Sequence, residues 1–330
     1  MANSKRIDWI DLAKGFCIML VVFHHVSSVL GVDYPFSVQA RGFRMPLYFI
    51  LSGLFFKQYE GFVGFLKRKT NKLLIPFLFF LASTLVLPSL LLHHDTSLGM
   101  FFQERVIIYN DPIWFLLCLF EVNLLFYLVQ WVAEKISIEH KSLLTIVIAL
   151  LLGINGLVLG AFQLRLPLYF DSALSALPLF AFGWWLFRHT AFLPSPVNYV
   201  RDGAIALAGL MVLWLFAVPV KWINNEFSWE ALPVVYLCGI GGTMMVLIMS
   251  KMIGHLLVIS YWGRYSIIIL CTHYPVAMIF ERIFGRYLSG GLLVALVFVM
   301  TMVVCWLLIP LMKRFLPHVT AQKDVIKVGV

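Results

Sequence analysis

Long apolar runs separated by short polar segments dominate the chain. A run of about 20 predominantly apolar residues is enough to cross the hydrocarbon core of a bilayer as an α-helix. The pattern predicts ten such helices, at residues 9–30, 44–56, 73–92, 112–132, 143–161, 170–188, 203–220, 232–250, 258–280 and 291–312. The second run is short, so we expect it to be tilted, partly buried or extended at its start. The predicted fold is an all-α membrane protein with a single membrane-embedded domain over residues 1–330.

The polar segments between these runs carry an uneven distribution of cations. With the N-terminus in the cytoplasm, 18 of the 25 lysines and arginines fall on cytoplasmic segments and 7 on the opposite side. Lysine and arginine are enriched in the cytoplasmic loops of membrane proteins. An even number of spans places both termini on the same side of the membrane. The charge count predicts that this side is the cytoplasm. The expected location is the inner (cytoplasmic) membrane of the cell.

Composition agrees with this class of protein. Hydrophobic residues make up 62% of the chain and charged residues only 12%, against about 25% charged residues in soluble proteins. We assign the net charge of +9 to cytoplasmic loops and to a site for an anionic ligand, not to nucleic-acid binding. The five cysteines lie in apolar runs without metal or redox spacing, so they are predicted to be buried apolar side chains, and no metal is expected.

A histidine pair, His24 and His25, lies about two-thirds of the way along the first predicted helix. Polar groups inside hydrocarbon are costly, so they usually face a partner or a cavity. Lys14 precedes His25 by eleven residues, which is about three helical turns, so both lie on one face about 16 Å apart. His25 could act as a general base, or it could only hydrogen-bond between packed helices. His24 points about 100° away and is expected to be a neighbour or a structural group.

A basic run, Lys67-Arg68-Lys69-Thr70-Asn71-Lys72, stands just before the third predicted helix. One interpretation is a cytoplasmic cluster that orients the protein and touches anionic membrane lipid. The other is a docking site for a cofactor with several phosphates, which clustered lysine and arginine side chains recognise.

Two further polar residues lie inside predicted helices. Glu121 is about 14 Å from the outer end of the fourth helix and His25 about 8 Å from the outer end of the first, so the two could meet. The alternative is that Glu121 pairs with another group. His273, near the outer end of the ninth helix, is a second candidate site histidine, or it has a packing role.

These residues fall into a series of short motifs. They are Arg6–Gly15 with a histidine eleven residues after Lys14, Met45–Gly53, Lys69-x-x-Lys72 followed by Leu73-Leu74-Ile75-Pro76, Trp114–Leu116 and Thr272–Pro275. In this order they resemble the acyltransferase-3 family of integral membrane acyltransferases, especially its stand-alone sugar (exopolysaccharide) O-acetyltransferase branch. The chain has lysine at positions 14, 69 and 72, where the family usually has arginine. Lysine keeps the charge but loses bidentate recognition of phosphate.

The resemblance implies transfer of an acyl group, expected to be acetyl, from acetyl-CoA to a hydroxyl of a cell-surface glycan or its lipid-linked precursor. The polyanionic end of CoA would bind Lys67, Arg68, Lys69 and Lys72, and its pantetheine arm would run along the Lys14 face. His25 would deprotonate the acceptor hydroxyl, with Glu121 and His273 as further site residues. Direct transfer and an acyl-histidine relay both remain open.

Two other classes of membrane protein share the general pattern. A transporter or flippase of a glycan or lipid intermediate would also have many helices and intramembrane charges. Transporters often show internal repeats with broken helices in matching places, and no such pair is evident. A purely structural membrane subunit would not explain Lys14, His25, Glu121 and His273 together.

Overall fold

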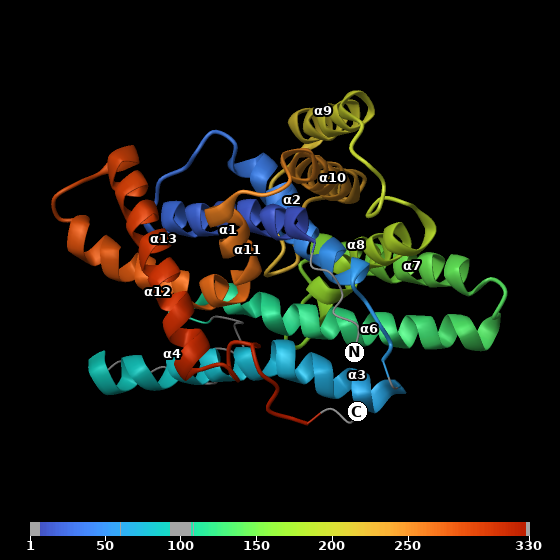
Figure 1. The fold of residues 1–330 in the computed structure, drawn as a ribbon, viewed down its shortest axis with the longest axis horizontal. Helices are drawn as coiled ribbons and strands as arrows, with labels where there is room; N and C mark the ends of the chain where they lie inside the picture. The colour runs from blue at the N-terminus through green and yellow to red at the C-terminus, as the bar shows by residue number, and fades with distance from the viewer. Residues whose placement is uncertain (1–6, 60, 93–106, 108, 328–330) are drawn as a thin grey trace. The chain divides into compact units, whose positions relative to one another are not determined.

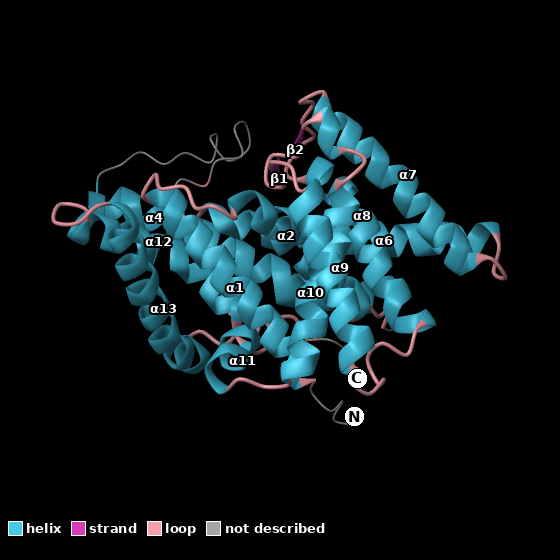
Figure 2. Cartoon of the chain, turned by 90° about the horizontal axis from the view of Figure 1, so that it is seen from above, coloured by secondary structure: helices cyan, strands magenta, loops and turns pink. Residues whose placement is uncertain are grey.

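The computed structural model describes the backbone of residues 7–59, 61–92, 107 and 109–327, and the side chains of these ranges except 87–92 (Figure 1). Within them nine helices are long and apolar enough to cross a membrane. The predicted all-α membrane fold is therefore confirmed. The only strands in the described ranges form a two-residue hairpin, β1 (Val220–Lys221) and β2 (Glu226–Phe227), visible in Figure 2.

The helices follow the predicted runs closely at most positions. The α-helices are α1 (Asp8–Val29), α2 (Ser37–Leu54), α3 (Gly61–Lys69), α4 (Ile75–Leu92), α6 (Trp114–Ile136), α7 (Lys141–Ala161), α8 (Phe170–His189), α9 (Tyr199–Phe216), α10 (Val235–Ile253), α11 (Leu257–Arg264), α12 (Ser266–Phe284) and α13 (Gly290–Phe315). Three short helical turns complete the set: η1 (Thr70–Leu74), η2 (Asp111–Ile113) and η3 (Trp229–Ala231).

Three elements differ from the apolar runs. Helix α2 begins at Ser37 and carries Arg41 and Arg44, so it is extended at its start, and it is less apolar than the nine membrane-length helices. The predicted span 258–280 is two helices, because the backbone leaves helical geometry at Tyr265. The third span begins at Gly61, so the basic run lies inside a helix and does not precede it. Lysine and arginine are good helix formers with apolar stems, so a fall in hydropathy does not end a helix.

The helices form two compact units. The first comprises Met1–Tyr48, Pro194–Val218 and Leu237–Ile309, and the second comprises Phe49–Leu193, Pro219–Tyr236 and Pro310–Val330.

In the first unit, α1 packs directly against α11 and α12. Two glycines allow the close approach of α1 and α11. A Cβ on Gly15 would lie 2.0 Å from the Ile259 carbonyl oxygen, and one on Gly263 would lie 1.8 Å from the Asp11 carbonyl oxygen. Small residues at such contacts let helix backbones meet in a membrane. This contact fixes α1, which carries both histidines of the predicted site.

The second unit is built around α6, α7 and α8. Aromatic rings fill its core, with ring centroids of Phe126 4.9 Å from those of Phe56 and Phe180. Asn225, in the β1–β2 turn, donates to the Gly156 carbonyl oxygen at 2.8 Å and accepts from the Ser175 hydroxyl at 2.7 Å. The hairpin is thereby tied to α7 and α8 through the buried Asn225 amide.

Candidate functional site

Helices α1 and α12 bring two of the predicted site residues together. Nδ1 of His25 lies 2.9 Å from Nε2 of His273, across 248 residues of sequence. His273 is fully buried and His25 partly so. The ring of Tyr274 stands edge-on to His25, with centroids 5.8 Å apart. The sequence singled out each histidine but not their hydrogen bond.

The partners of His273 set the protonation of both rings. Nδ1 of His273 is 2.8 Å from the Ile269 carbonyl oxygen, which can only accept, so this nitrogen is assigned the proton. In a neutral ring Nε2 of His273 then carries the lone pair and accepts from Nδ1–H of His25. The chain of bonds leaves Nε2 of His25 as the unprotonated nitrogen. An imidazole oriented in this way by a second group is suited to remove a proton.

The end of α1 folds the chain back toward His24. The N–H of Val32 bonds to the Ser27 carbonyl and the N–H of Gly31 to the Ser28 carbonyl. This pair of bonds is a Schellman cap, which needs a residue in the left-handed region after the helix. Gly31 supplies it, with φ of +63°. The cap therefore determines where the following residues lie.

The returning segment places Tyr34 over His24. The Tyr34 hydroxyl lies 3.3 Å from Nδ1 of His24, and its ring contacts Phe23 and Phe36 with centroids 5.0 Å away in each case. Burial raises the pKa of Tyr34, so the phenol stays protonated at neutral pH. It donates to Nδ1 of His24 or accepts from it, according to which His24 nitrogen carries the proton. His24 therefore lies beside His25 and contacts Tyr34, and its structural role stays a prediction.

A pocket of about 220 Å³ lies beside this contact. Polar side chains form much of its wall: His24, Ser27, Ser28, Asp33, Tyr34 and Arg41. Arg44 follows Arg41 by three residues on α2 and donates to the Leu20 carbonyl oxygen of α1 at 3.4 Å. Apart from His24, sequence reasoning missed these residues. Two arginines three apart in a largely apolar helix were the available signal.

The basic run lies at an irregular point of the α3–η1–α4 helix. The N–H of Ile75 bonds to the carbonyl oxygen of Thr70, five residues back, so η1 is a turn of π-helix. Pro76 explains it, because a proline ring clashes with the carbonyl four residues earlier in an α-helix. Such turns are frequent at functional sites. Two cations of the run lie against aromatic rings, Arg68 over Tyr59 and Lys69 over Phe65.

The C-terminal segment, residues 316–327, is bound to this same turn in the second unit (Figure 1). Asn71, 0% exposed, accepts from the N–H groups of Val325 and Ile326 at 2.9 Å and donates to the Ile326 carbonyl oxygen at 2.8 Å. Lys72 donates to the Ala321 carbonyl oxygen at 2.9 Å and pairs with the Asp324 carboxylate at 3.0 Å. Lys72, one of the lysines predicted to bind the cofactor, is therefore already paired with the Asp324 carboxylate.

Two further predicted site residues, Lys14 and Glu121, lie on α1 and α6. Lys14 lies on α1, and its carbonyl oxygen accepts from the Tyr48 hydroxyl at 3.1 Å. Helix α1 is continuous from Lys14 to His25, so their shared face is retained. Glu121 is buried on α6, 5% exposed, in the second unit, and its meeting with His25 stays a prediction. Arg6, from the first motif, lies outside the described residues.

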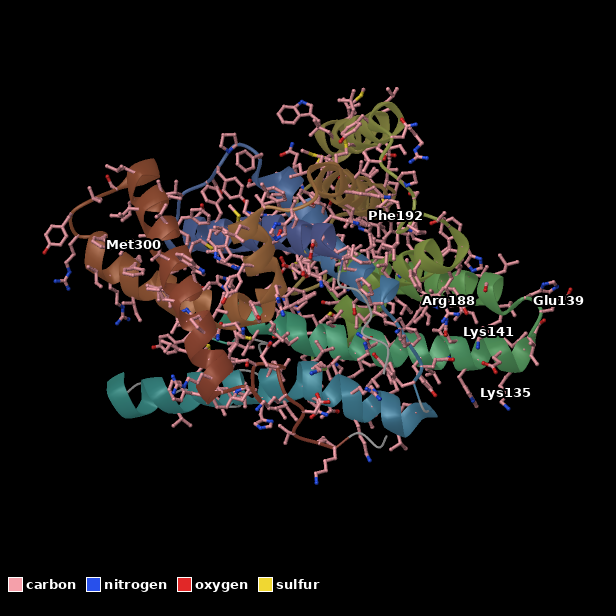
Figure 3. All side chains as sticks on the ribbon, in the orientation of Figure 1. Lys135, Glu139, Lys141, Arg188, Phe192 and Met300 are labelled. Atoms are coloured by element: carbon pink, nitrogen blue, oxygen red, sulfur yellow. The ribbon has the colours of Figure 1, made fainter. Side chains whose placement is uncertain are left out.

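Three cations that were predicted to be cytoplasmic belong to the second unit. Figure 3 shows Lys135 and Lys141 at the turn between α6 and α7, with Arg188 at the end of α8 toward the same side of the view. Lys141 also pairs with Glu134. The side of the membrane on which these cations and the termini lie stays a prediction.

A comparison with protein families identifies the functional class of the protein. The acyltransferase-3 family model, whose description is "Acyltransferase domain", matches residues 7–310. The chain belongs to the acyltransferase-3 family. It is a multi-pass membrane acyltransferase, so the transporter alternative loses its support. No curated protein and no solved structure matches the chain.

The acyltransferase-3 match includes every residue of the predicted site, from Lys14 to His273, and ends before the C-terminal segment. His25, His273 and the basic run therefore lie within the acyltransferase region. The segment bound to Asn71 lies outside that region.

Proposed function

We propose that this acyltransferase is an O-acetyltransferase of the inner membrane, which moves an acetyl group from acetyl-CoA to a hydroxyl of a cell-surface glycan or its lipid-linked precursor. The observation that carries the proposal is the hydrogen bond between His25 and His273. It presents one unprotonated imidazole nitrogen, held by a second histidine, inside a membrane acyltransferase.

The chemical step needs one base. Nε2 of His25 takes the proton of the acceptor hydroxyl while its oxygen attacks the thioester carbonyl. The new C–O bond forms, the C–S bond breaks, and the CoA thiolate recovers the proton. His273 keeps Nδ1 of His25 protonated throughout, so the basic nitrogen stays at the same position. An acyl-histidine relay would use the same nitrogen as a nucleophile.

The negative charges of acetyl-CoA would bind to positively charged side chains of the protein. The basic run offers Lys67, Arg68, Lys69 and Lys72 to the phosphates of CoA. Lys14 supplies another cation on the His25 face of α1. With the N-terminus in the cytoplasm, His25 would lie in the outer half of the membrane, so donor and acceptor could arrive from opposite sides.

The direct test compares surface polysaccharide from cells with and without the protein by mass spectrometry. We expect loss of one acetyl group per modified sugar when the protein is absent. Transfer of radiolabelled acetyl from acetyl-CoA to glycan by isolated membranes should show the same dependence. An unchanged acetyl content together with no transfer by the membranes would refute the proposal.

Removing charge from the basic run should weaken acetyl-CoA binding. Lys69→Ala and Lys72→Ala should each weaken binding to the purified protein by roughly three- to tenfold, the usual size of one charge-assisted contact. Added salt should weaken wild-type binding more than that of the variants, because fewer charges are screened in the variants. Lys69→Arg with Lys72→Arg should bind at least as well, through bidentate contacts.

Lys135→Ala is the matched control for this prediction. It removes an exposed cation from the same unit, away from the basic run, and should leave affinity unchanged. If the two alanine variants of the basic run also bind acetyl-CoA normally, the run serves topology or lipid contact.

Asp324→Asn should tighten acetyl-CoA binding a fewfold. The Asp324 carboxylate pairs with Lys72, so an anionic cofactor has to displace it, and asparagine keeps the shape without the charge. Isothermal titration of the purified protein measures the effect, with Glu139→Gln, on the α6–α7 turn, as the control for lost negative charge. Weaker binding in Asp324→Asn would mean that the C-terminal segment supports the site and does not compete for it.

A further inference from the structure

The wall of the pocket beside His24 is largely polar. The hydroxyl of Ser27, a residue 3% exposed, has no hydrogen-bond partner among the described residues, and neither has Nε of Arg41. Both residues line the pocket. Buried polar groups in proteins are nearly always hydrogen-bonded, and leaving one unpaired is costly. These two atoms are themselves almost inaccessible, so a ligand in the pocket would meet the other polar groups of the wall, above all the Arg41 guanidinium.

The charges of the pocket indicate the chemistry of that ligand. Arg41 forms no ion pair with any described residue, although Asp33 lines the same pocket. The second arginine, Arg44, lies buried three residues further along α2. A guanidinium with a free edge binds carboxylate or phosphate through two parallel hydrogen bonds. Asp33 can only accept, so it suits a hydroxyl donor of the same ligand.

The dimensions and the walls of the pocket narrow the choice. A volume of about 220 Å³ is below the roughly 300–1,000 Å³ of sites for drug-sized ligands, and it suits one six-membered sugar ring. The Tyr34 ring at the wall, backed by Phe23 and Phe36, offers a surface with an apolar face and a polar edge. The hydroxyl of Ser28, an exposed residue of the pocket wall, can bond to a ring hydroxyl.

We propose that this pocket binds the acceptor through a sugar ring that carries an anionic group, a carboxylate or a phosphate, held by Arg41. The inference rests on the proposed function, because the ring is taken to belong to the acceptor. The rings of His24 and His25 have centroids 5.4 Å apart. A ring bound against His24 therefore lies within one sugar unit of the catalytic nitrogen. The pocket would select acidic acceptors and set their position.

Binding can be measured without any acetyl transfer. Saturation-transfer NMR on the detergent-solubilised full chain would use glucuronate, glucose 6-phosphate and glucose as probes. We expect both acids to bind at least tenfold more tightly than glucose, and Arg41→Gln to remove that difference. Arg286→Gln, which removes an exposed arginine after α12, should change nothing. Equal binding of glucose by the wild-type protein, or an undiminished preference in Arg41→Gln, would overturn the inference.

Ser28→Ala separates loss of ligand contact from loss of folding. It removes the hydroxyl of an exposed residue in the pocket wall, so thermal stability should stay the same. Binding of both acids should nevertheless fall a fewfold. Unchanged binding in this variant would contradict the role given to this hydroxyl.

Transfer assays then identify the source of the anion. The acceptors would be a glucuronate-containing oligosaccharide, its neutral glucose counterpart, and a polyprenyl-phosphate-linked sugar in vesicles. Preference for the first assigns an acidic sugar, and preference for the third assigns the phosphate of a lipid-linked precursor. Arg41→Gln should remove either preference. If no acceptor is acetylated the proposed function fails, whereas the NMR result still decides the pocket. If the neutral acceptor is acetylated best, the function holds and the pocket inference fails.

Discussion

Replacing His25 by alanine should reduce acetyl transfer by at least 10²–10⁴-fold, the range that a positioned general base contributes, and thus to near the detection limit. The reason is that Nε2 of His25 is the nitrogen left unprotonated by the bonds from His25 to His273 and from His273 to the Ile269 carbonyl oxygen. The measurement is radiolabelled acetyl transfer by membranes with equal amounts of folded protein. Acetyl-CoA binding should be unchanged, because the phosphates are held elsewhere.

His24→Ala is the matched control for His25→Ala, one residue earlier on the same helix. His24 bonds to Tyr34 and lines the pocket, so its loss should raise the KM for the acceptor more than it lowers kcat. Near-normal activity in His25→Ala would refute the mechanism. A larger loss in His24→Ala than in His25→Ala would mean that the base has been assigned to the wrong histidine.

Replacing His273 by leucine should lower kcat by roughly 10–100-fold with little change in acetyl-CoA binding. His273 is proposed as a positioning residue. Without it, Nδ1–H of His25 loses its acceptor, and the two neutral tautomers of the His25 ring compete. His273→Gln should recover part of the activity, because a glutamine oxygen can accept the same hydrogen bond. Kinetics in membranes, with thermal stability measured in parallel, separate this effect from misfolding.

The double variant gives a second readout for His273. If His273 acts through His25, His25→Ala combined with His273→Leu should be no less active than His25→Ala alone. Independent, multiplicative losses would assign His273 a separate role. Equal activity of His273→Leu and His273→Gln, both as stable as the wild-type protein, would show that the hydrogen bond does not orient the base.

Much of the fold follows from the one-dimensional pattern. Apolar runs of membrane length predict helices because no other open structure satisfies the backbone in hydrocarbon. The same reasoning identified His25 and His273 separately, since a polar side chain within such a run is visible at its own position. Gly31 directly after the first helix was a readable end signal, but its Schellman cap was not predicted. Where charged residues lower the hydropathy, as in the basic run, the pattern missed the start of the helix at Gly61.

The partners of these residues were decided by the tertiary structure alone. His25 meets His273 across 248 residues, and Asn71 holds the C-terminal segment across about 255. Nothing in either local sequence encodes the other. Arg41 and Ser27 share a pocket because α2 packs beside α1, whose end is capped. The break at Tyr265 lets α11 and α12 pack on α1 separately. A sequence shows that a buried polar group must be satisfied, since burial has a cost at every position. Which group satisfies it depends on how the helices pack in three dimensions.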